Sequence, residues 1–575
     1  MSFSYTSGMS RFSRKFRQCA LVSALGAGLA AAPALAAPSG TLVYALPPAT
    51  NITYLNPVTP TNYYDVVNAW AYESMYKPLF WVDHRIQVDY ARSIASSITT
   101  KDGIHYFITL NPKWHWSDGK PVTTADVIFD YQLIKSISLK NSSNYGGWGI
   151  GGIPNDVVSV KALGPYRMEI TLNQAYSPNW FILNGAAQLI PLPKQAWDKY
   201  PGHPAKTLAY LQKRGDSLAF FRASPIDGPF RMTQSQHNVQ FVMTANAEYD
   251  GHMPQYHKLV FRYFTSSDSE FNALRTGQLQ IGYVPFHLYA EYHKLSGYRL
   301  APSTSWGITY IYPSFLNPSA KALKDLVVRQ ALQMAVDQSA MVKVIYHGQA
   351  VAQYGPVPSQ PSTYLSPSLK SGKVPYPYDP AKAKAMLEQA GWHPVHGVMT
   401  KGSERLAFSM KYASGSASTQ QVAELFASAA AREGIKITLA PQPFDTIIGE
   451  LASPKTWDLL YYGNGWVYYP DVYPTGYGLF GTGGGSDSSG YSNPTADRLI
   501  AATHAFTSAK KSLQSLYAYQ DFLAKDLPVI SLPEAAGSYT GAVGALTVYA
   551  SGVGGILNHL NPVGLLSPQY WTLSK

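Results

Sequence analysis

Short apolar segments typical of strands alternate with amphipathic segments typical of helices along almost the whole chain. The apolar segments include 41–46, 104–110 and 529–532, and the helical segments include 65–76 and 325–336. The apolar residues of the helical segments recur at a spacing of about three to four, and the strand segments are continuous apolar runs or alternate with a period of about two. Because the two kinds of segment are intermixed, the sequence predicts an α/β fold.

Residues that favour helix ends support these boundaries. Thr124 and Asp337 stand where N-caps are expected, and Asp379 is followed by a proline in the first turn of the next helix. Gly348 and Gly391 mark the ends of two of these helices. The sequence therefore predicts helices that begin at Thr124, Asp337 and Asp379.

The first 36 residues have the three parts of a secretory signal peptide. Four basic residues between 11 and 17 precede an apolar run from Cys19 to Ala32, and Ala34-Leu35-Ala36 forms a cleavage site. The apolar run is too short and too rich in alanine and glycine for a membrane span. We therefore expect cleavage after Ala36 and a mature protein in the periplasm, with a retained N-terminal anchor as the alternative.

The mature chain is long enough for more than one domain and contains no cysteine. Removing 36 residues from 575 leaves 539, and a single core stops growing near ~250–300 residues, so at least two domains are expected. The only cysteine, Cys19, lies at the start of the apolar run, where it is badly placed for lipid attachment. The mature protein should therefore have no disulfide and no thiolate chemistry.

Charge and hydropathy argue against nucleic-acid binding and against a membrane-spanning helix in the mature chain. The formal net charge of +11 falls to +7 without the four basic residues of the signal peptide. The remaining basic residues are scattered and form no cluster interleaved with aromatic residues, so nucleic acid is not an expected partner. No later segment has the ~18 consecutive apolar residues that a membrane-spanning helix requires.

The stretch 457–473, WDLLYYGNGWVYYPDVY, joins a strand pattern to an aromatic loop. Residues 459–462 form the apolar run of a fully buried strand, and Gly463 and Gly465 allow a sharp turn or a close approach of the backbone. Open α/β sheets bind ligands at the ends of their strands, so this loop is a candidate ligand floor, with core packing as the alternative. Its candidate ligand-binding residues are Trp466, Tyr468, Tyr469 and Asp471.

Five further segments carry motifs in a fixed order along nearly the whole mature chain. They are WHWSDGKPVTTADVIFDY (114–131), DGPFRMTQ with NAEYDG (227–234 and 246–251), ALRTGQLQI (273–281), VRQALQMAVDQSAMVKVIYHGQAVAQYGPVP (328–358) and YDPAKAKAMLEQAGW (378–392). In this order they resemble the dipeptide/oligopeptide-binding family (family 5) of ABC-transporter periplasmic solute-binding proteins.

The resemblance implies a two-lobed clamshell of the class II periplasmic-binding type, with an additional domain inserted in the first lobe. Chain crossings near Thr265 and Ala535 would form a hinge, and the ligand would be enclosed between the lobes. The implied division is 37–79, 184–264 and 536–575 for the first lobe, 80–183 for the additional domain and 265–535 for the second lobe.

The function implied by the resemblance is that of a solute receptor for an ABC importer. A monomer would capture a peptide or peptide-like solute and deliver it to the transmembrane subunits of an inner-membrane permease, without cofactor or catalysis. An oligosaccharide or another uncharged amphipathic solute is the alternative ligand. A secreted hydrolase or a periplasmic chaperone on the same fold are the remaining alternatives.

Motifs for catalysis or metal binding do not stand out in the sequence. There is no G-x-S-x-G, H-E-x-x-H or P-loop motif. His393 and His396 are separated by a proline and have no third ligand near them in the sequence, so we expect a solvated loop and no metal site.

The resemblance also makes one departure from the family pattern visible. In the family the loop with Gly465-Trp466 lines the pocket, and peptide-binding members carry an aspartate three residues after the tryptophan, which pairs with the peptide α-ammonium. Here that position is Tyr469, which brings no charge, and a buried ammonium without a carboxylate costs several kcal/mol. Asp471 would substitute only with a shifted loop; otherwise the ligand is not held by a free amino terminus.

Five further candidates for ligand contact lie outside this loop. For each of them, packing within the protein is the alternative. They are Tyr54, Asn56, Trp148, Trp306 and Tyr354.

Overall fold

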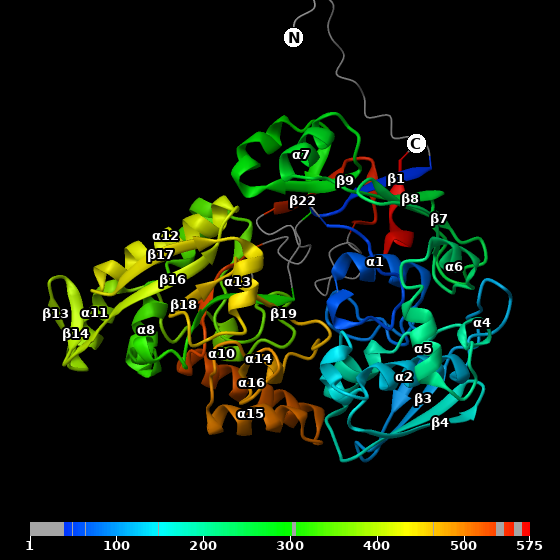
Figure 1. Ribbon diagram of the computed structural model, residues 1–575, viewed down its shortest axis with the longest axis horizontal. Helices are drawn as coiled ribbons and strands as arrows, with labels where there is room; N and C mark the ends of the chain where they lie inside the picture. The colour runs from blue at the N-terminus through cyan, green and yellow to red at the C-terminus, as the bar shows by residue number, and fades with distance from the viewer. Residues whose placement is uncertain are drawn as a thin grey trace, which may run out of the picture. The chain divides into compact units, whose positions relative to one another are not determined.

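The computed structural model describes eight stretches of the chain, all within the compact unit Ala37–Lys575. The predicted signal peptide, 1–36, lies outside the described residues. Helices and strands alternate through these stretches, so the predicted α/β class is confirmed (Figure 1). The described residues are 40–48, 50–63, 65–147, 149–301, 306–463, 465–535, 545–556 and 566–574.

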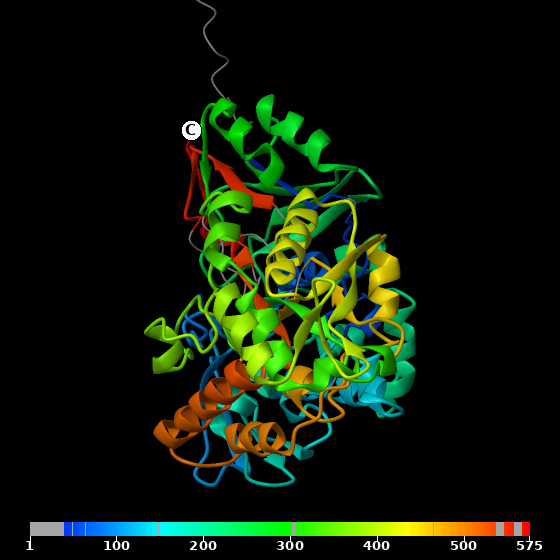
Figure 2. The same ribbon diagram turned by 90° about the vertical axis from the view of Figure 1, so that its left-hand side faces the viewer.

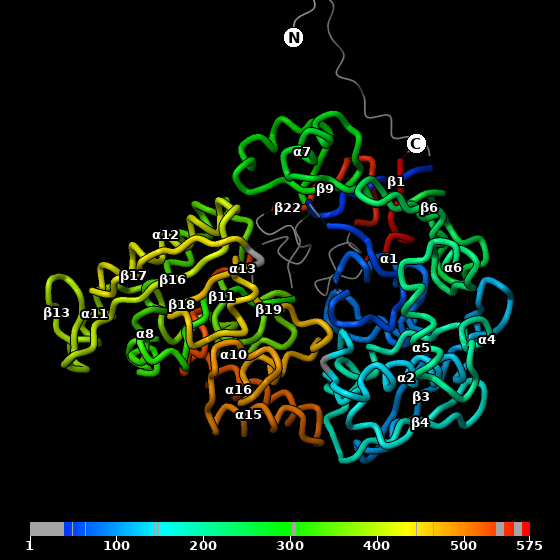
Figure 3. Tube along the Cα trace, viewed as in Figure 1, coloured from blue at the N-terminus to red at the C-terminus, as the bar shows by residue number. Residues whose placement is uncertain are grey.

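A seven-stranded sheet brings together segments from the two ends of the described chain (Figure 3). β1 pairs in parallel with β8 on one side and β9 on the other, and β22 pairs antiparallel with β9 and β10. In chain order the strands are β1 (Thr41–Ala45), β6 (Phe230–Gln236), β7 (Gln240–Ala245), β8 (Lys258–Arg262), β9 (Ile281–Pro285), β10 (Tyr298–Leu300) and β22 (Ala545–Ala550).

Helix α1 (Val66–Met75) packs on this sheet and is buried on almost every side. The Asp65 carboxylate accepts a hydrogen bond from the Val67 N–H at 2.8 Å and so caps the first turn, which confirms the predicted helix start. The Trp70 ring meets the Tyr44 ring of β1 edge-on, with 5.2 Å between centroids. Because the whole helix is enclosed, its carboxylate at Glu73 also lies inside the protein, 7% exposed.

A separate four-stranded sheet, in the order β2-β3-β5-β4, carries helix α2 (Thr124–Ser138). The predicted cap at Thr124 was wrong by one residue. Thr123 is the N-cap, and the Asp126 carboxylate accepts its backbone N–H at 2.8 Å, while the Thr124 hydroxyl instead donates to the Gly164 carbonyl at 2.8 Å. The strands are β2 (Ala95–Thr99), β3 (His105–Leu110), β4 (Val157–Gly164) and β5 (Arg167–Leu172).

The second large sheet has β18 near its centre, and all three residues of that strand are buried. The buried strand predicted for 459–462 is therefore confirmed for 459–461, and Tyr462 lies just beyond it and is half-buried. Helix α12 (Ala417–Arg432) packs on β16 and β17. In sheet order the strands are β17 (Lys436–Gln442), β16 (Ala407–Ala413), β18 (Leu459–Tyr461), β11 (Gly307–Pro313) and β19 (Gly465–Val467), and β20 (Ile530–Leu532) also pairs with β11.

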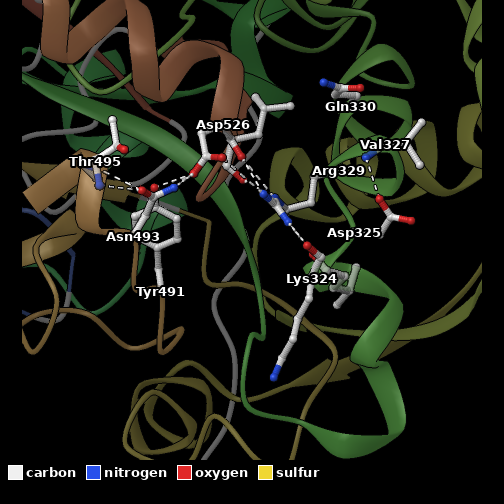
Figure 4. Close-up of polar contacts among 12 residues, drawn as sticks. Lys324, Asp325, Val327, Arg329, Gln330, Tyr491, Asn493, Thr495 and Asp526 are labelled. Carbon is white, nitrogen blue, oxygen red and sulfur yellow. Dashed lines mark hydrogen bonds and ion pairs between the residues drawn. The ribbon is translucent and has the colours of Figure 1, made fainter.

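Helix α8 (Leu326–Met334) is joined to the end of α16 (Ala509–Asp526) by one buried arginine (Figure 4). The Arg329 guanidinium donates to the carbonyls of Leu323 and Lys324, at 2.9 and 2.8 Å, and to those of Asp526 and Leu527, at 2.9 and 3.0 Å. It also lies 3.7 Å from the Asp526 carboxylate. Carbonyls at the ends of two helical segments are thereby satisfied by a single side chain.

Other elements complete the chain. The predicted caps at Asp337 and Asp379 are confirmed, since their carboxylates accept from the N–H groups of Ala340 and Lys382. Figure 2 shows α15 and α16 side by side in orange. The remaining described α-helices of four or more residues are α4 (Lys194–Trp197), α5 (Pro204–Gln212), α6 (Leu218–Ala223), α7 (Ser267–Arg275), α10 (Pro367–Lys370), α11 (Pro380–Gln389), α13 (Phe444–Glu450), α14 (Tyr477–Phe480) and α15 (Pro494–His504).

Three small sheets pair the remaining short strands. His393 lies in an exposed strand of one of them, and His396 in the turn that follows. The strands are β12 (Ala350–Val351) with β21 (Glu534–Ala535), β13 (His393–Val395) with β14 (Val398–Lys401) and β15 (Glu404–Arg405), and β23 (Val553–Gly554) with β24 (Thr572–Leu573).

β9 and β10 belong to the seven-stranded sheet, and this affects where the chain passes from the first large sheet to the second. β8 and β9 both run parallel to β1, so α7 is a crossover that returns the chain to the first sheet. The chain therefore leaves this sheet after Leu300, and the crossing expected near Thr265 comes too early. At the other expected crossing, β21 ends at Ala535 and β22 belongs to the first sheet. The division into lobes remains a proposal, with its first crossing moved beyond β10.

Candidate ligand site

Two glycines permit the short interruption between β18 and β19, which both pair antiparallel with β11. Gly463 has a φ of +88°, in the left-handed region. A Cβ on Gly465 would stand 1.6 Å from the Ile308 carbonyl oxygen, so only glycine allows β19 to lie this close to β11. Both expectations for these glycines are confirmed, although the segment that follows Gly465 begins as a short strand.

Two aromatic residues predicted as ligand contacts are fully buried and hold this loop in place. Trp306 donates from Nε1 to the Val472 carbonyl at 2.8 Å, and the Tyr468 hydroxyl donates to the Pro356 carbonyl. Both side chains are 0% exposed. In this conformation their observed contacts are packing contacts, and neither residue borders the cavity that lies next to the loop.

Tyr469 reaches from the loop to helix α1. Its hydroxyl donates a hydrogen bond to Glu73 Oε1 at 3.0 Å. The two residues are separated by 396 positions in the chain, so this contact joins the loop of the second large sheet to the helix on the first. Among the described residues predicted for ligand contact, Tyr469 is the one that lines the cavity next to this loop.

That cavity is small and is enclosed mainly by aromatic and aliphatic groups. The space inside it that a water molecule can occupy is about 40 Å³. Such a volume accepts a few water molecules or one small functional group. No lysine, arginine or histidine lies among the described residues that form its wall. The rings in the wall belong to Tyr72, Phe80, Tyr145 and Tyr469, and its polar side chains include Glu73 and Gln188.

The environment of Glu73 disfavours a negative charge. Burial raises the pKa of Glu73 to about 8, and the hydrogen bond from Tyr469 offsets part of this rise. The second carboxyl oxygen, Oε2, is buried and has no hydrogen-bond partner in the described structure. At neutral pH the side chain is therefore mostly a neutral acid facing a cavity without a cation.

Asp471 is engaged elsewhere. Its carboxylate accepts from the Asn184 amide at 2.5 Å, and the same amide donates to the Tyr473 carbonyl at 2.9 Å. The Asn184 oxygen accepts from the Tyr473 N–H at 2.5 Å, so one side chain ties the loop to the helical turn 181–185. Burial raises the pKa of Asp471 to about 7. The shifted loop that would let Asp471 replace the family aspartate is not observed.

The remaining predicted contacts lie around this region in different ways. Tyr54 is 3% exposed and stacks on Tyr63, with 4.6 Å between ring centroids, and the side-chain Oδ1 of Asn56 accepts from the Val58 N–H at 3.0 Å. Tyr354 is half-buried against a small apolar cluster. None of these three borders the cavity.

Trp466 and Trp148 complete the predicted set. The Trp466 side chain is half-buried, and its Nε1 is enclosed without a hydrogen-bond partner in the described structure. Trp148 lies outside the described residues, whereas its neighbour Gly147 lines the cavity. Whether these residues contact a ligand stays a prediction.

Sequence analysis missed Glu73 and the rings of Tyr72, Phe80 and Tyr145. One signal for Glu73 was present, because it is the only charged residue in the otherwise uncharged helical segment 66–75. A charged side chain is rarely fully buried unless it is paired, so a carboxylate inside such a helix marks a position with a special environment.

Within the described residues no group of three or more His, Cys, Asp or Glu side chains could hold a metal ion. In the same part of the chain, no helix has the length and apolar character needed to cross a membrane.

Comparisons with known proteins agree with the architecture. The chain is 24% identical over 462 residues to the oligopeptide-binding protein AppA of Bacillus subtilis, an alignment that covers 79% of each protein. It is 26% identical over 399 residues to the nickel-binding periplasmic protein of Escherichia coli, which covers 68% of this chain and 69% of that protein.

A solved structure has the same fold. AppA of Bacillus subtilis, in complex with a nonapeptide, superposes with a TM-score of 0.68 at 20% identity, over 93% of this chain and 99% of that one. The predicted two-lobed clamshell is confirmed by this likeness. At the level of sequence, residues 89–487 match the family model for bacterial extracellular solute-binding proteins, family 5 (middle region). Because this match covers more than half of the sequence, the chain belongs to family 5 of the bacterial extracellular solute-binding proteins.

Proposed function

We propose that this protein is the periplasmic receptor of an ABC importer and captures a peptide or peptide-like solute between its two lobes. The observation that carries the proposal is the contact between Tyr469 and Glu73, which joins the loop at β19 to helix α1 beside an aromatic cavity. A solute held there would contact helix α1, which packs on the first large sheet, and the loop at β19, which belongs to the second. Such a solute would favour the closed form by its higher affinity for that form.

The relatives support a peptide as the solute class. One curated relative is named an oligopeptide-binding protein, and its solved structure holds a nonapeptide. Another relative binds nickel by its name, so the family accommodates more than one kind of solute. The aromatic wall of the cavity favours organic groups, since each ring that becomes covered can contribute several kcal/mol at about 25 cal/mol/Å².

The mechanism is noncatalytic. An open form admits the solute, closure buries it, and the closed form docks on the transmembrane subunits of an inner-membrane permease. A monomer that is exported by the signal peptide 1–36 and cleaved after Ala36 would perform this cycle in the periplasm. Transport proteins of this family bind solutes, and hydrolysis of the solute is not a step of the proposed cycle.

The experiment measures thermal shifts of the purified mature protein against a peptide library and an oligosaccharide library. The proposal predicts a ligand-dependent rise in melting temperature with peptides, because a ligand that binds only the folded state stabilises it. A rise with oligosaccharides alone would replace the peptide by the alternative solute. The absence of any shift would contradict the receptor function, and release of shortened products would indicate a hydrolase.

A further inference from the structure

The cavity beside α1 contains one acidic side chain that no cation of the described wall compensates when it ionises. Glu73 is 7% exposed, one of its oxygens accepts from Tyr469, and the other has no hydrogen-bond partner in the described structure. A buried carboxylate is costly unless a cation or further hydrogen bonds compensate it. No basic side chain among the described wall residues supplies that cation.

Location distinguishes Glu73 from other buried carboxylates of the protein. Glu270 and Glu433 also have buried oxygens without hydrogen-bond partners in the described structure. Neither of them borders this cavity, whereas Glu73 forms part of its wall. Only Glu73 of the three therefore has adjacent space in this cavity for a ligand group.

The surroundings of that space suit a small organic cation. Four aromatic rings, those of Tyr72, Phe80, Tyr145 and Tyr469, share the wall with Glu73. Ring faces attract a desolvated ammonium, and a carboxylate neutralises it. The volume of about 40 Å³ for water accepts an ammonium group and its first carbon, while the rest of a solute would extend beyond the cavity.

We propose that Glu73, with the rings around it, receives the ammonium group of the solute and so takes the place of the charge absent at Tyr469. This inference rests on the proposed function and narrows the solute class to peptides and related molecules with a free amine. The carboxylate would come from helix α1 on the first sheet, and Tyr469 would orient it by holding Oε1.

Binding of such a cation has a proton balance that can be measured. Burial raises the pKa of Glu73 to about 8, so near pH 7 the free protein holds a proton on this group. An arriving ammonium favours the ionised carboxylate, and the proton passes to the buffer. The other titratable groups of the described wall are the phenols of Tyr72, Tyr145 and Tyr469, and burial raises the pKa of Tyr145. Asp471, in the same loop, is bonded to Asn184.

The experiment compares a tetrapeptide library that has free amino termini with the same library after N-acetylation. Binding to the full mature chain is measured for the wild type, Glu73→Gln and, as a matched control, Glu433→Gln, which changes a buried carboxylate away from the cavity. The wild type and the control should prefer free amines by about tenfold or more, and Glu73→Gln should lose this preference.

Each outcome has a defined meaning. Equal affinity of the wild type for both libraries, or an undiminished preference in Glu73→Gln, would overturn this inference while leaving the receptor function intact. Binding of neither library would overturn the peptide function and this inference together. If Glu73→Gln does not fold, calorimetry of the wild type in two buffers at pH 7 decides. Free-amine peptides should release up to about one proton per site and acetylated peptides none, and equal release would contradict the proposal.

Discussion

Arg329 and Glu73 are both buried ionisable side chains, and their surroundings are opposite. Arg329 donates to carbonyl oxygens at the ends of two helical segments and lies beside the Asp526 carboxylate. Glu73 has one hydrogen bond, from Tyr469, and one oxygen without a partner in the described structure. The first residue is satisfied by the protein alone, and the second faces a cavity.

This difference indicates that Arg329 serves the stability of the fold and that Glu73 serves ligand binding. A buried charge that the fold satisfies completely contributes to stability, and its removal leaves several polar groups unpaired. A buried charge that the fold leaves incomplete costs stability, and a ligand can remove that cost. We therefore expect substitutions at the two positions to change different properties of the protein.

The largest effect is expected at Arg329. Arg329→Met leaves four carbonyls without the guanidinium that donates to them and removes the ion pair with Asp526, so the free energy of unfolding should fall by about 3–5 kcal/mol. Urea denaturation measures this change. The control is Arg405→Met, because Arg405 is exposed, and that variant should differ little from the wild type. Equal stability of the two variants would contradict the stabilising role of Arg329.

The next effect is the pH dependence of stability that Glu73 causes. Its folded pKa of about 8 lies above the ordinary glutamate pKa of 4.5, so between these values the folded state holds more protons than the unfolded state. The contribution of Glu73 is therefore fully present below about pH 4.5 and is lost as the pH rises toward 8. Relative to Glu73→Gln, the wild type should lose about 2–3 kcal/mol between pH 5 and 7.

Denaturation at a series of pH values measures that difference. Glu248→Gln is the control, because Glu248 is exposed, and its stability should follow that of the wild type at every pH. Parallel curves for the wild type and Glu73→Gln would show that the carboxyl group of Glu73 titrates as it does in the unfolded chain.

A smaller effect is expected at Asn184, which fixes the position of the loop. Asn184→Ala removes the hydrogen bonds to Asp471 and to both backbone groups of Tyr473, and should cost about 1–3 kcal/mol of stability. Because Tyr469 and Asp471 share one loop, solute affinity should fall as well. A destabilised variant with unchanged affinity would separate the loop from the ligand site. Asn173→Ala, with an exposed amide, is the control.

The smallest effect concerns Trp466. If its half-buried ring contacts the solute, Trp466→Ala should weaken binding by about 1 kcal/mol or more, which titration calorimetry resolves. Tyr477→Ala removes another ring, one that is 54% exposed, and should leave the affinity unchanged. Unchanged affinity in a folded Trp466→Ala variant would remove Trp466 from the candidate site.

Local patterns predicted the elements of the fold well. The strand at β1, the helix capped by Asp65 and the buried strand at β18 all follow from apolar periodicity and capping residues. The crossing near Thr265 could not be placed from local patterns, because a strand pattern does not state which sheet the strand joins. β9 pairs with β1, which lies more than two hundred residues earlier in the chain, and only this long-range pairing shows that α7 is a crossover.

The candidate site was less predictable for a similar reason. Its central contact joins Glu73 and Tyr469 across 396 positions, and neither residue has a neighbour in the sequence that indicates the other. The aromatic loop drew the prediction to Tyr469. Trp306 and Tyr468, which were also predicted as ligand contacts, are packed inside the protein. Residue type therefore indicated rings, and only the fold distinguished those that face the cavity.

The most direct test of the account is a crystal structure of the mature protein with a bound tetrapeptide that has a free amino terminus. We predict the peptide ammonium nitrogen within about 3 Å of Glu73 Oε2, between the rings of Tyr72 and Tyr469. A peptide bound with its ammonium at another carboxylate, or with only water beside Glu73, would contradict the account.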